Sequence, residues 1–346
     1  PATAQPGSWR PRPAAVADYG AALARRYSGR YPDPGNPGTP LPRAAGFQVW
    51  NEPNLPQYLS PQWAGNRVAS APHYRLMLNA VYRAVKAIAP RALVVTAGTA
   101  PYGDPAPGGQ RVMPARFWRS VLCLKRGVRP LPCRAPARFD VLAHHPYPHG
   151  SPRTRAAGGD DVAIADMRKL RRILRVAQRT GRALPRGPRK RLWVTEISYD
   201  SAPQDPAGVP EGRHARWMAE TFYLLWRAGV DTITWFRILD AAPMPTFGET
   251  NQSGLLGLDG RPKVAARAFA FPFVAERAGR RRLRVWGRSP VAGRVRIERL
   301  RRGRWRHVRS IAAQRHGTFL LRIPAVRGRD RLRARIGTET SLTWRR

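Results

Sequence analysis

The chain has 346 residues, 42% of them hydrophobic, which is enough for one large domain and a smaller one. It has no run of about 18 apolar residues, so a membrane-spanning helix is not expected. The formal net charge is +41, nearly all from arginine. Two explanations stay open: a compositional bias that also enriches Ala, Pro and Gly, or attraction to a polyanion. The basic residues are scattered and no nucleic-acid-binding motif accompanies them, so no specific nucleic-acid partner is expected.

An α/β fold is indicated by the pattern from residue 14 to about residue 275. A helix is predicted over 14–27, followed by a Pro/Gly-rich loop over 32–42. Short apolar runs rich in Val, Ile, Phe or Trp then predict buried strands at 46–50, 92–97, 139–143, 191–195 and 230–236. Helical patterns lie between them, which is typical of parallel strands joined by helical crossovers.

Three crossover helices can be placed by their apolar stripes and end signals. The first includes residues 74–88 and ends before Pro90, and the last runs over 213–228. The middle helix has an apolar stripe over 164–177. We predict Asp160 or Asp161 as its N-cap and Gly181 as its C-terminal stop.

The segment 276–346 has a different pattern. Runs at 282–287, 293–300, 304–311, 318–323 and 330–336 alternate apolar and basic residues between turn signals. The pattern predicts a small all-β sandwich domain with arginine on its solvent face.

The two cysteines, Cys123 and Cys133, are ten positions apart and have no nearby histidine, so they do not indicate a metal site. A local disulfide of a secreted protein is preferred, and two free thiols are the alternative. We expect no metal and no cofactor.

Two glutamates follow strand-like runs, Glu52 after 46–50 and Glu196 after 191–195. Glutamate is a poor strand former and is costly to bury, so its position at the end of a buried run calls for a function. Two such residues far apart in sequence suggest a carboxylate pair in one cleft, as glycoside hydrolases use.

Four motifs in chain order resemble the strand ends of clan A glycoside hydrolases, in the style of family 39-like and family 5-like bacterial enzymes. They are Trp50-Asn51-Glu52-Pro53-Asn54, the run 139–147 ending His145-Pro146-Tyr147, Trp193-Val194-Thr195-Glu196, and Thr232-Ile233-Thr234-Trp235-Phe236. The resemblance implies a (β/α)₈ barrel whose active site lies at the carboxyl ends of the strands.

The resemblance also implies roles for individual residues. Glu196 would be the nucleophile and Glu52 the acid/base of a retaining hydrolase that cleaves β-glycosidic bonds in a poly- or oligosaccharide. Asn51 would bind the sugar 2-hydroxyl, His145 and Tyr147 would lie near the nucleophile, and Trp235 would contact a pyranose ring.

By this resemblance the run at 46–50 corresponds to strand four. The first three strands are then missing and the chain is a fragment with a partial barrel over 1–275 and a sandwich over 276–346. Loops 102–110, 148–159 and 240–253, with Phe247, Glu249 and Asn251, would set specificity. The alternatives are a non-catalytic carbohydrate- or cell-wall-binding protein and a polyanion-binding module built on the Arg-rich C-terminal domain.

Overall fold

The computed structural model describes residues 5–105, 109–244, 246, 251–325 and 331–345. The chain divides into two compact units. One comprises Pro1–Ile197 and Ala228–Thr234, and the other comprises Ser198–Arg227 and Trp235–Arg346. The chain passes between the units more than once, so this division differs from the boundary after residue 275, which stays a prediction.

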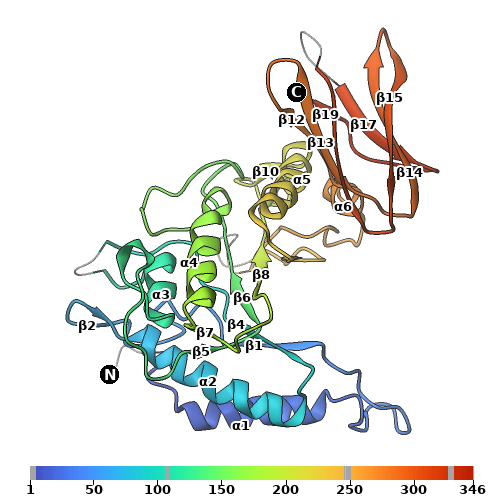
Figure 1. Cartoon of the computed structure of the whole chain (residues 1–346). Coiled ribbons are helices and arrows are strands. Elements are labelled where there is room, and N and C mark those ends of the chain that lie inside the picture. Colours follow the sequence, from blue (N-terminus) through green and yellow to red (C-terminus); the bar gives the residue numbers. More distant parts are fainter. Residues whose placement is uncertain (1–4, 106–108, 245, 247–250, 326–330, 346) are drawn as a thin grey trace. The chain divides into compact units, whose positions relative to one another are not determined.

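A five-stranded sheet forms the centre of the first unit (Figure 1). Its order is β1 (Gly46–Val49), β4 (Leu93–Thr96), β6 (Val141–His144), β8 (Arg191–Ile197) and β11 (Thr232–Trp235). The pairs β1/β4, β4/β6 and β6/β8 are parallel. All five predicted strands are therefore confirmed, and the parallel order follows from the helical crossovers between them.

Helices α1 (Pro13–Arg26), α2 (Ser70–Ile88), α3 (Pro114–Val121) and α4 (Arg168–Arg179) accompany this sheet. Helices α1 and α2 run side by side (Figure 1), and they approach so closely that a Cβ on Gly20 would lie 3.0 Å from Val81. The start predicted for α4 was wrong. The helix begins at Arg168, after a 3-10 turn η2 (Ile164–Asp166).

The two aspartates predicted to cap α4 have other partners. Asp160 forms two hydrogen bonds with the Arg119 guanidinium, at 2.8 and 2.6 Å, and Asp161 accepts the Gly103 N–H at 2.9 Å. The predicted stop is confirmed, because Gly181 has φ +68° directly after the helix and Arg182 N–H returns to the Ala177 carbonyl.

Aspartate carboxylates accept backbone hydrogen bonds near the amino ends of the central strands. Asp140 precedes β6, accepts the Val94 N–H at 2.8 Å and pairs with Lys86 at 2.8 Å. Asp231 precedes β11 and accepts the Leu192 N–H at 3.0 Å. The carboxyl ends of the strands, in contrast, carry the residues predicted to be functional.

The second unit contains α5 (Glu211–Ala228), α6 (Val264–Ala270) and two antiparallel sheets. One sheet has the order β12 (Phe273–Arg277), β13 (Arg282–Arg288) and β16 (Thr318–Pro324). The other has β15 (Arg304–Ala313), β14 (Gly293–Arg301), β17 (Arg331–Ile336) and β18 (Glu339–Thr340), with β19 (Trp344–Arg345) beside β17. The five strands predicted for this region are confirmed.

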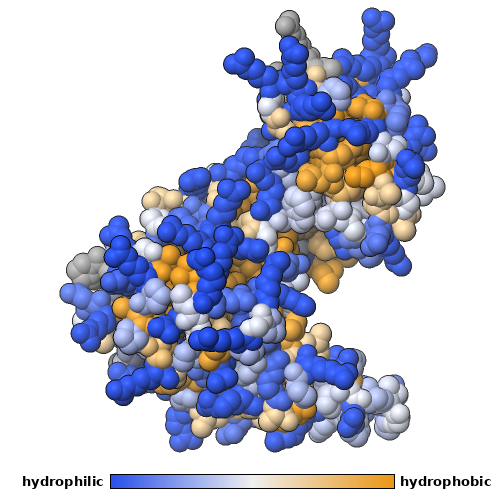
Figure 2. Space-filling model, viewed as in Figure 1, coloured by the Kyte–Doolittle hydropathy of each residue, from blue (hydrophilic) through white to orange (hydrophobic). Residues whose placement is uncertain are grey.

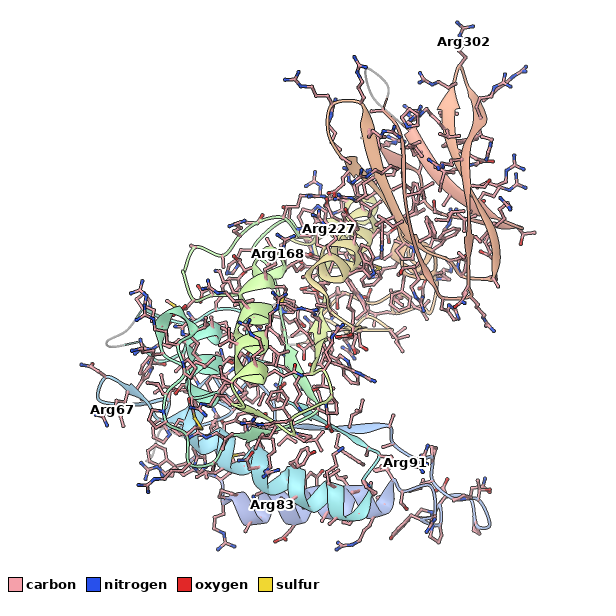
Figure 3. All side chains as sticks on the ribbon, viewed as in Figure 1. Arg67, Arg83, Arg91, Arg168, Arg227 and Arg302 are labelled. Atoms are coloured by element: carbon pink, nitrogen blue, oxygen red, sulfur yellow. A yellow bond between two sulfur atoms is a disulfide. The ribbon has the colours of Figure 1, made fainter. Side chains whose placement is uncertain are left out.

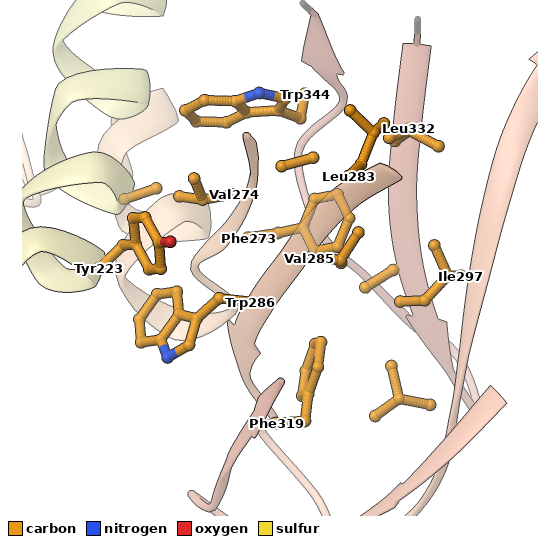
Figure 4. Packing of buried hydrophobic residues seen from close by; sticks show 14 of the residues in the cluster. Tyr223, Phe273, Val274, Leu283, Val285, Trp286, Ile297, Phe319, Leu332 and Trp344 are labelled. Atoms are coloured by element: carbon orange, nitrogen blue, oxygen red, sulfur yellow. The ribbon is translucent and has the colours of Figure 1, made fainter. Parts of the chain in front are cut away.

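Both sheets share one hydrophobic core, shown in Figure 4. The residues predicted to face inward are all buried there: Leu283, Val285, Val295, Ile297, Leu332 and Ile336. Tyr223 of α5 belongs to the same core, with its ring 5.6 Å from that of Trp286. The strands are thus packed together with a helix from the preceding part of the chain.

The remaining elements are short: β2 (Trp63–Ala64), β3 (Arg67–Val68), β5 (Ala137–Arg138), β7 (Ala183–Leu184), β9 (Ser201–Ala202), β10 (Val209–Pro210) and the 3-10 turn η1 (Arg126–Val128). Cys123 and Cys133 form a disulfide, as preferred from the sequence. Among the described residues, no helix has the length and apolar character needed to cross a membrane.

Candidate active site

Glu52 lies in a tightly turned segment directly after β1. Its backbone has φ +36° and that of Trp50 has φ +75°, conformations that are uncommon for side chains of this size. The Glu52 N–H donates to the Gly98 carbonyl at 3.0 Å, and the Trp50 indole donates to the Tyr58 carbonyl at 2.8 Å. Such backbone conformations persist where surrounding bonds enforce them, and they are frequent at functional sites.

Asn54 fixes this turn to the segment after β4. Its side-chain amide is fully buried and donates to the carbonyls of Ala100 and Val112 at 3.1 and 3.0 Å. Its side-chain oxygen accepts the Ala100 N–H at 2.9 Å. Sequence reasoning missed Asn54 as a positioning residue. Its place after Asn51-Glu52-Pro53 was the available signal.

His145 contacts both predicted catalytic carboxylates. Its Nδ1 lies 2.9 Å from Glu52 Oε1 and 3.8 Å from Glu196 Oε2. The two carboxylate oxygens are therefore no farther apart than the sum of these distances. Glu52 and Glu196 are far apart in sequence, and the fold brings both carboxylates next to His145.

The His145 ring is held from its other side. Nε2 lies 3.1 Å from Thr195 Oγ1, and the backbone N–H donates to the Thr99 carbonyl at 3.0 Å. The tautomer with the proton on Nδ1 satisfies both contacts, because Nδ1–H donates to Glu52 while Nε2 accepts the Thr195 hydroxyl. The side chain is 2% exposed, so its orientation is fixed by packing as well as by hydrogen bonds.

Tyr147 orients the second carboxylate. Its hydroxyl donates to Glu196 Oε1 at 2.7 Å. The Glu196 side chain is 28% exposed and that of Glu52 is 15% exposed. Both groups are therefore positioned by protein contacts and still reachable from solvent.

Gly98 is a second residue that sequence reasoning missed. A Cβ at this position would lie 2.0 Å from His145 Nε2 and 2.2 Å from Cδ2. Only glycine therefore allows the segment after β4 to pass against the imidazole. An isolated glycine after a predicted strand was the available signal.

His144, which we had assigned to structure, is fully buried between two other partners. Its Nδ1 bonds Thr99 Oγ1 at 2.8 Å and its Nε2 bonds the Val162 carbonyl at 2.7 Å. Burial lowers the pKa of His144 to about 3, because the charged imidazolium would lose its hydration. The neutral ring thus packs beneath the site.

Two predicted sugar contacts stay predictions. The Asn51 side chain is half-buried and forms no hydrogen bond within the described part of the chain. Trp235 is 7% exposed and donates its indole N–H to the Ser253 carbonyl at 2.9 Å. Its side chain packs against Tyr199, His214 and Phe222, all in the second unit.

The predicted specificity loops are described only in part. Phe247 and Glu249 lie outside the described residues, and Asn251 is placed in the second unit, where its carbonyl accepts the Ala241 N–H at 2.9 Å. Within the described ranges, no group of three or more His, Cys, Asp or Glu side chains is arranged to hold a metal ion.

The fold is similar to that of a known glycoside hydrolase. A family 39 glycoside hydrolase from the gut symbiont Bacteroides cellulosilyticus WH2 superposes with a TM-score of 0.51 at 17% identity, covering 90% of this chain and 61% of that one. A glucosidase from Croceicoccus marinus gives a TM-score of 0.49 at 15% identity, covering 94% and 77%.

No family model and no curated protein matches the sequence. The chain spans 61% of the length of the family 39 structure, and at 17% identity the likeness concerns the fold. The chain therefore shares a mixed α/β fold with a family 39 glycoside hydrolase, as the motif around Glu52 predicted.

Proposed function

We propose that the protein is a retaining glycoside hydrolase that cleaves β-glycosidic bonds. The contact of His145 Nδ1 with both Glu52 and Glu196 carries this proposal. These two contacts set an upper limit on the distance between the carboxylate oxygens, and the separation of about 5–5.5 Å typical of retaining enzymes lies below that limit. The separations of inverting enzymes, about 6.5–9.5 Å, lie mostly above it.

In the first step, Glu196 attacks the anomeric carbon and forms a glycosyl ester while Glu52 gives its proton to the leaving oxygen. In the second step, Glu52 takes a proton from water, and the resulting hydroxide displaces Glu196. The Tyr147 hydroxyl, 2.7 Å from Glu196 Oε1, fixes the carboxylate for attack and leaves the other oxygen available. Asn51 binds the sugar 2-hydroxyl and Trp235 provides a ring surface.

Three experiments test this assignment. A 2-deoxy-2-fluoro aryl β-glycoside should trap the ester, and peptide mass spectrometry should find the label on Glu196. Proton NMR of the first-formed product should show the β-anomer, whereas an α-anomer would identify an inverting enzyme. Glu196→Gln should lower kcat by at least about a thousandfold, and turnover equal to the parent's would reject it as the nucleophile.

Glu52→Ala should slow hydrolysis most for poor leaving groups, which depend on the proton that it supplies. An activated aryl glycoside should be affected less, and equal losses on both substrates would contradict the acid role. Oligosaccharide binding without any hydrolysis by the parent would instead support the non-catalytic alternative.

We also propose that the five-stranded sheet corresponds to strands four to eight of a (β/α)₈ barrel. The order β1-β4-β6-β8-β11 and the positions of Glu52 and Glu196 after the first and within the fourth of these strands support this assignment. An extracellular location is inferred as well, and the Cys123–Cys133 disulfide supports it because disulfides persist in oxidising compartments.

A further inference from the structure

A cavity of about 970 Å³ in the first unit has five basic residues among the fifteen that line it. Its wall comes from the β2/β3 hairpin, helix α3, the loop that carries η1, and residues 159–160. The cations in this wall are Arg67, Arg116, Arg119, Lys125 and Arg126, and the single carboxylate in it belongs to Asp160. We call this feature the basic cavity.

Most of the positive charge of the basic cavity has no opposing carboxylate. Arg119 is paired with Asp160 through two hydrogen bonds, so these two groups compensate each other. Arg67, Lys125 and Arg126 are exposed and form no ion pair among the described residues, although the charge of Arg126 helps that of Arg119 to lower the pKa of Asp160. Four cations, including Arg116, therefore remain to attract an anion.

Arg116 is held in place without a carboxylate. Its guanidinium lies 4.6 Å from the centre of the Trp63 ring and donates to the Asn66 carbonyl at 3.3 Å. The stacking orders the planar group and leaves donor positions for a ligand. It also covers one face of the Trp63 indole, which disfavours the stacking of a nucleic-acid base on that face.

The loop with Lys125 and Arg126 is held by a disulfide and by backbone hydrogen bonds. The Cys123–Cys133 disulfide closes it, Leu131 N–H donates to the Cys123 carbonyl at 2.8 Å, and Lys125 N–H donates to the Arg129 carbonyl at 2.9 Å. Cys123 itself lines the basic cavity. The cations are thus carried on an ordered loop, which lowers the entropic cost of binding an anion.

The wall of the basic cavity is hydrogen-bonded to the segment that carries Glu52. Met113 lines the cavity, and the adjacent Val112 exchanges backbone and side-chain hydrogen bonds with Asn54. Asn54 follows Glu52 by two residues. The basic cavity and Glu52 therefore lie on neighbouring segments of the first unit, which the buried residues Asn54 and Val112 join.

We propose that the basic cavity binds the carboxylate or sulfate groups of an acidic glycan, and that the substrate of the proposed hydrolysis is an anionic polysaccharide. This inference rests on the proposed function. Arginine is suited to the role, because its fork of N–H donors matches carboxylate and sulfate oxygens. The overall excess of Lys and Arg, 62 against 21 Asp and Glu, would strengthen the attraction over the largely hydrophilic surface in Figure 2.

The test measures binding in a Glu196→Gln background, so that no substrate is consumed. Isothermal titration would use the β-linked oligomannuronate and its methyl ester, which differ in charge, together with cellulose sulfate and a neutral cello-oligosaccharide. The variant Arg67→Ala/Arg126→Ala removes two exposed cavity cations. Arg83→Ala/Arg91→Ala is the matched control, because both arginines are exposed and lie elsewhere on the unit (Figure 3).

We expect an acidic glycan to bind, the neutral counterpart to bind at least about tenfold more weakly, and Arg67→Ala/Arg126→Ala to weaken the acidic complex about fivefold. The response to the two acidic probes separates carboxylate from sulfate recognition. The control should bind as the parent does. Equal losses in both double variants, or equal binding of charged and neutral glycans, would overturn the proposal.

A 20-nucleotide single-stranded DNA serves as a further probe. Binding of DNA that is lost in Arg67→Ala/Arg126→Ala, with no binding of either acidic glycan, would assign the cavity to nucleic acid and overturn the proposal. Because binding is scored without turnover, these outcomes are distinct from failure of the proposed function. That failure would appear as absence of hydrolysis by the parent.

Discussion

The contact between Gly98 and His145 yields a quantitative prediction. In Gly98→Ala the new methyl carbon would lie 2.0 Å from His145 Nε2 and 2.2 Å from Cδ2, so the imidazole must move. Overpacking of this kind costs about 1–3 kcal/mol. The ring would also leave Glu52 and Thr195, now at 2.9 and 3.1 Å. We therefore expect the melting temperature to fall by several degrees, since about 1 kcal/mol corresponds to 2–4 °C in a unit of this size.

A double-mutant cycle separates this clash from a general effect of the substitution. With His145→Ala the ring is absent, so adding Gly98→Ala should cost less than about 1 kcal/mol and show a coupling of about 1–2 kcal/mol. Gly212→Ala is a control, because its Cβ would meet no atom within 4 Å. Thermal and urea unfolding measure all variants. A Gly98→Ala cost that is the same with and without the His145 ring would refute the reasoning.

Three further substitutions have defined outcomes. Asn54→Leu should cost about 3 kcal/mol or more in urea unfolding, because three buried backbone groups lose their partners. Exposed Gln57→Leu should cost little, and equal costs would contradict the assignment. Tyr147→Phe should lower kcat about tenfold or more by removing the hydrogen bond to Glu196, and an unchanged kcat would argue against that role. Burial lowers the pKa of His214 to about 4, so between about pH 6.5 and 4 the unfolded chain binds the proton first, and on acidification His214 contributes a loss of about 3 kcal/mol in addition to that from His144. His214→Phe should flatten this loss in unfolding measured from pH 7 to pH 4, and a loss as steep as the parent's would exclude His214 as its source.

The strands of the central sheet could be predicted because each is a short apolar run that is buried in the fold. Val94 and Val95 of β4 and Val141 and Leu142 of β6 are almost fully buried. A strand covered by helices has no polar face, so its sequence departs clearly from that of the amphipathic helices around it. The strands of the second unit were recognised by the opposite signal, the alternation of apolar and arginine residues.

The bridging role of His145 could not be predicted in the same way. Its contacts join positions 93 and 50 residues apart, to Glu52 and Thr195, and they depend on how far each strand extends. The motif placed His145 near the nucleophile, whereas its shorter contact is with Glu52. The N-cap prediction at Asp160 failed for a related reason. A distant guanidinium, that of Arg119, provides a stronger partner than a helix start does.

The carboxylate pair and Trp235, the predicted contact for a sugar ring, belong to different units of the chain. Glu52, His145 and Glu196 all belong to the first unit, so their mutual distances do not depend on where the second unit lies. Trp235 belongs to the second unit, and its indole is already occupied by the Ser253 carbonyl and three neighbouring rings. Loss of activity in Trp235→Ala would therefore not distinguish a sugar contact from a core residue. A raised KM with unchanged kcat in Trp235→Phe would, because a packing defect has no reason to act on substrate affinity alone.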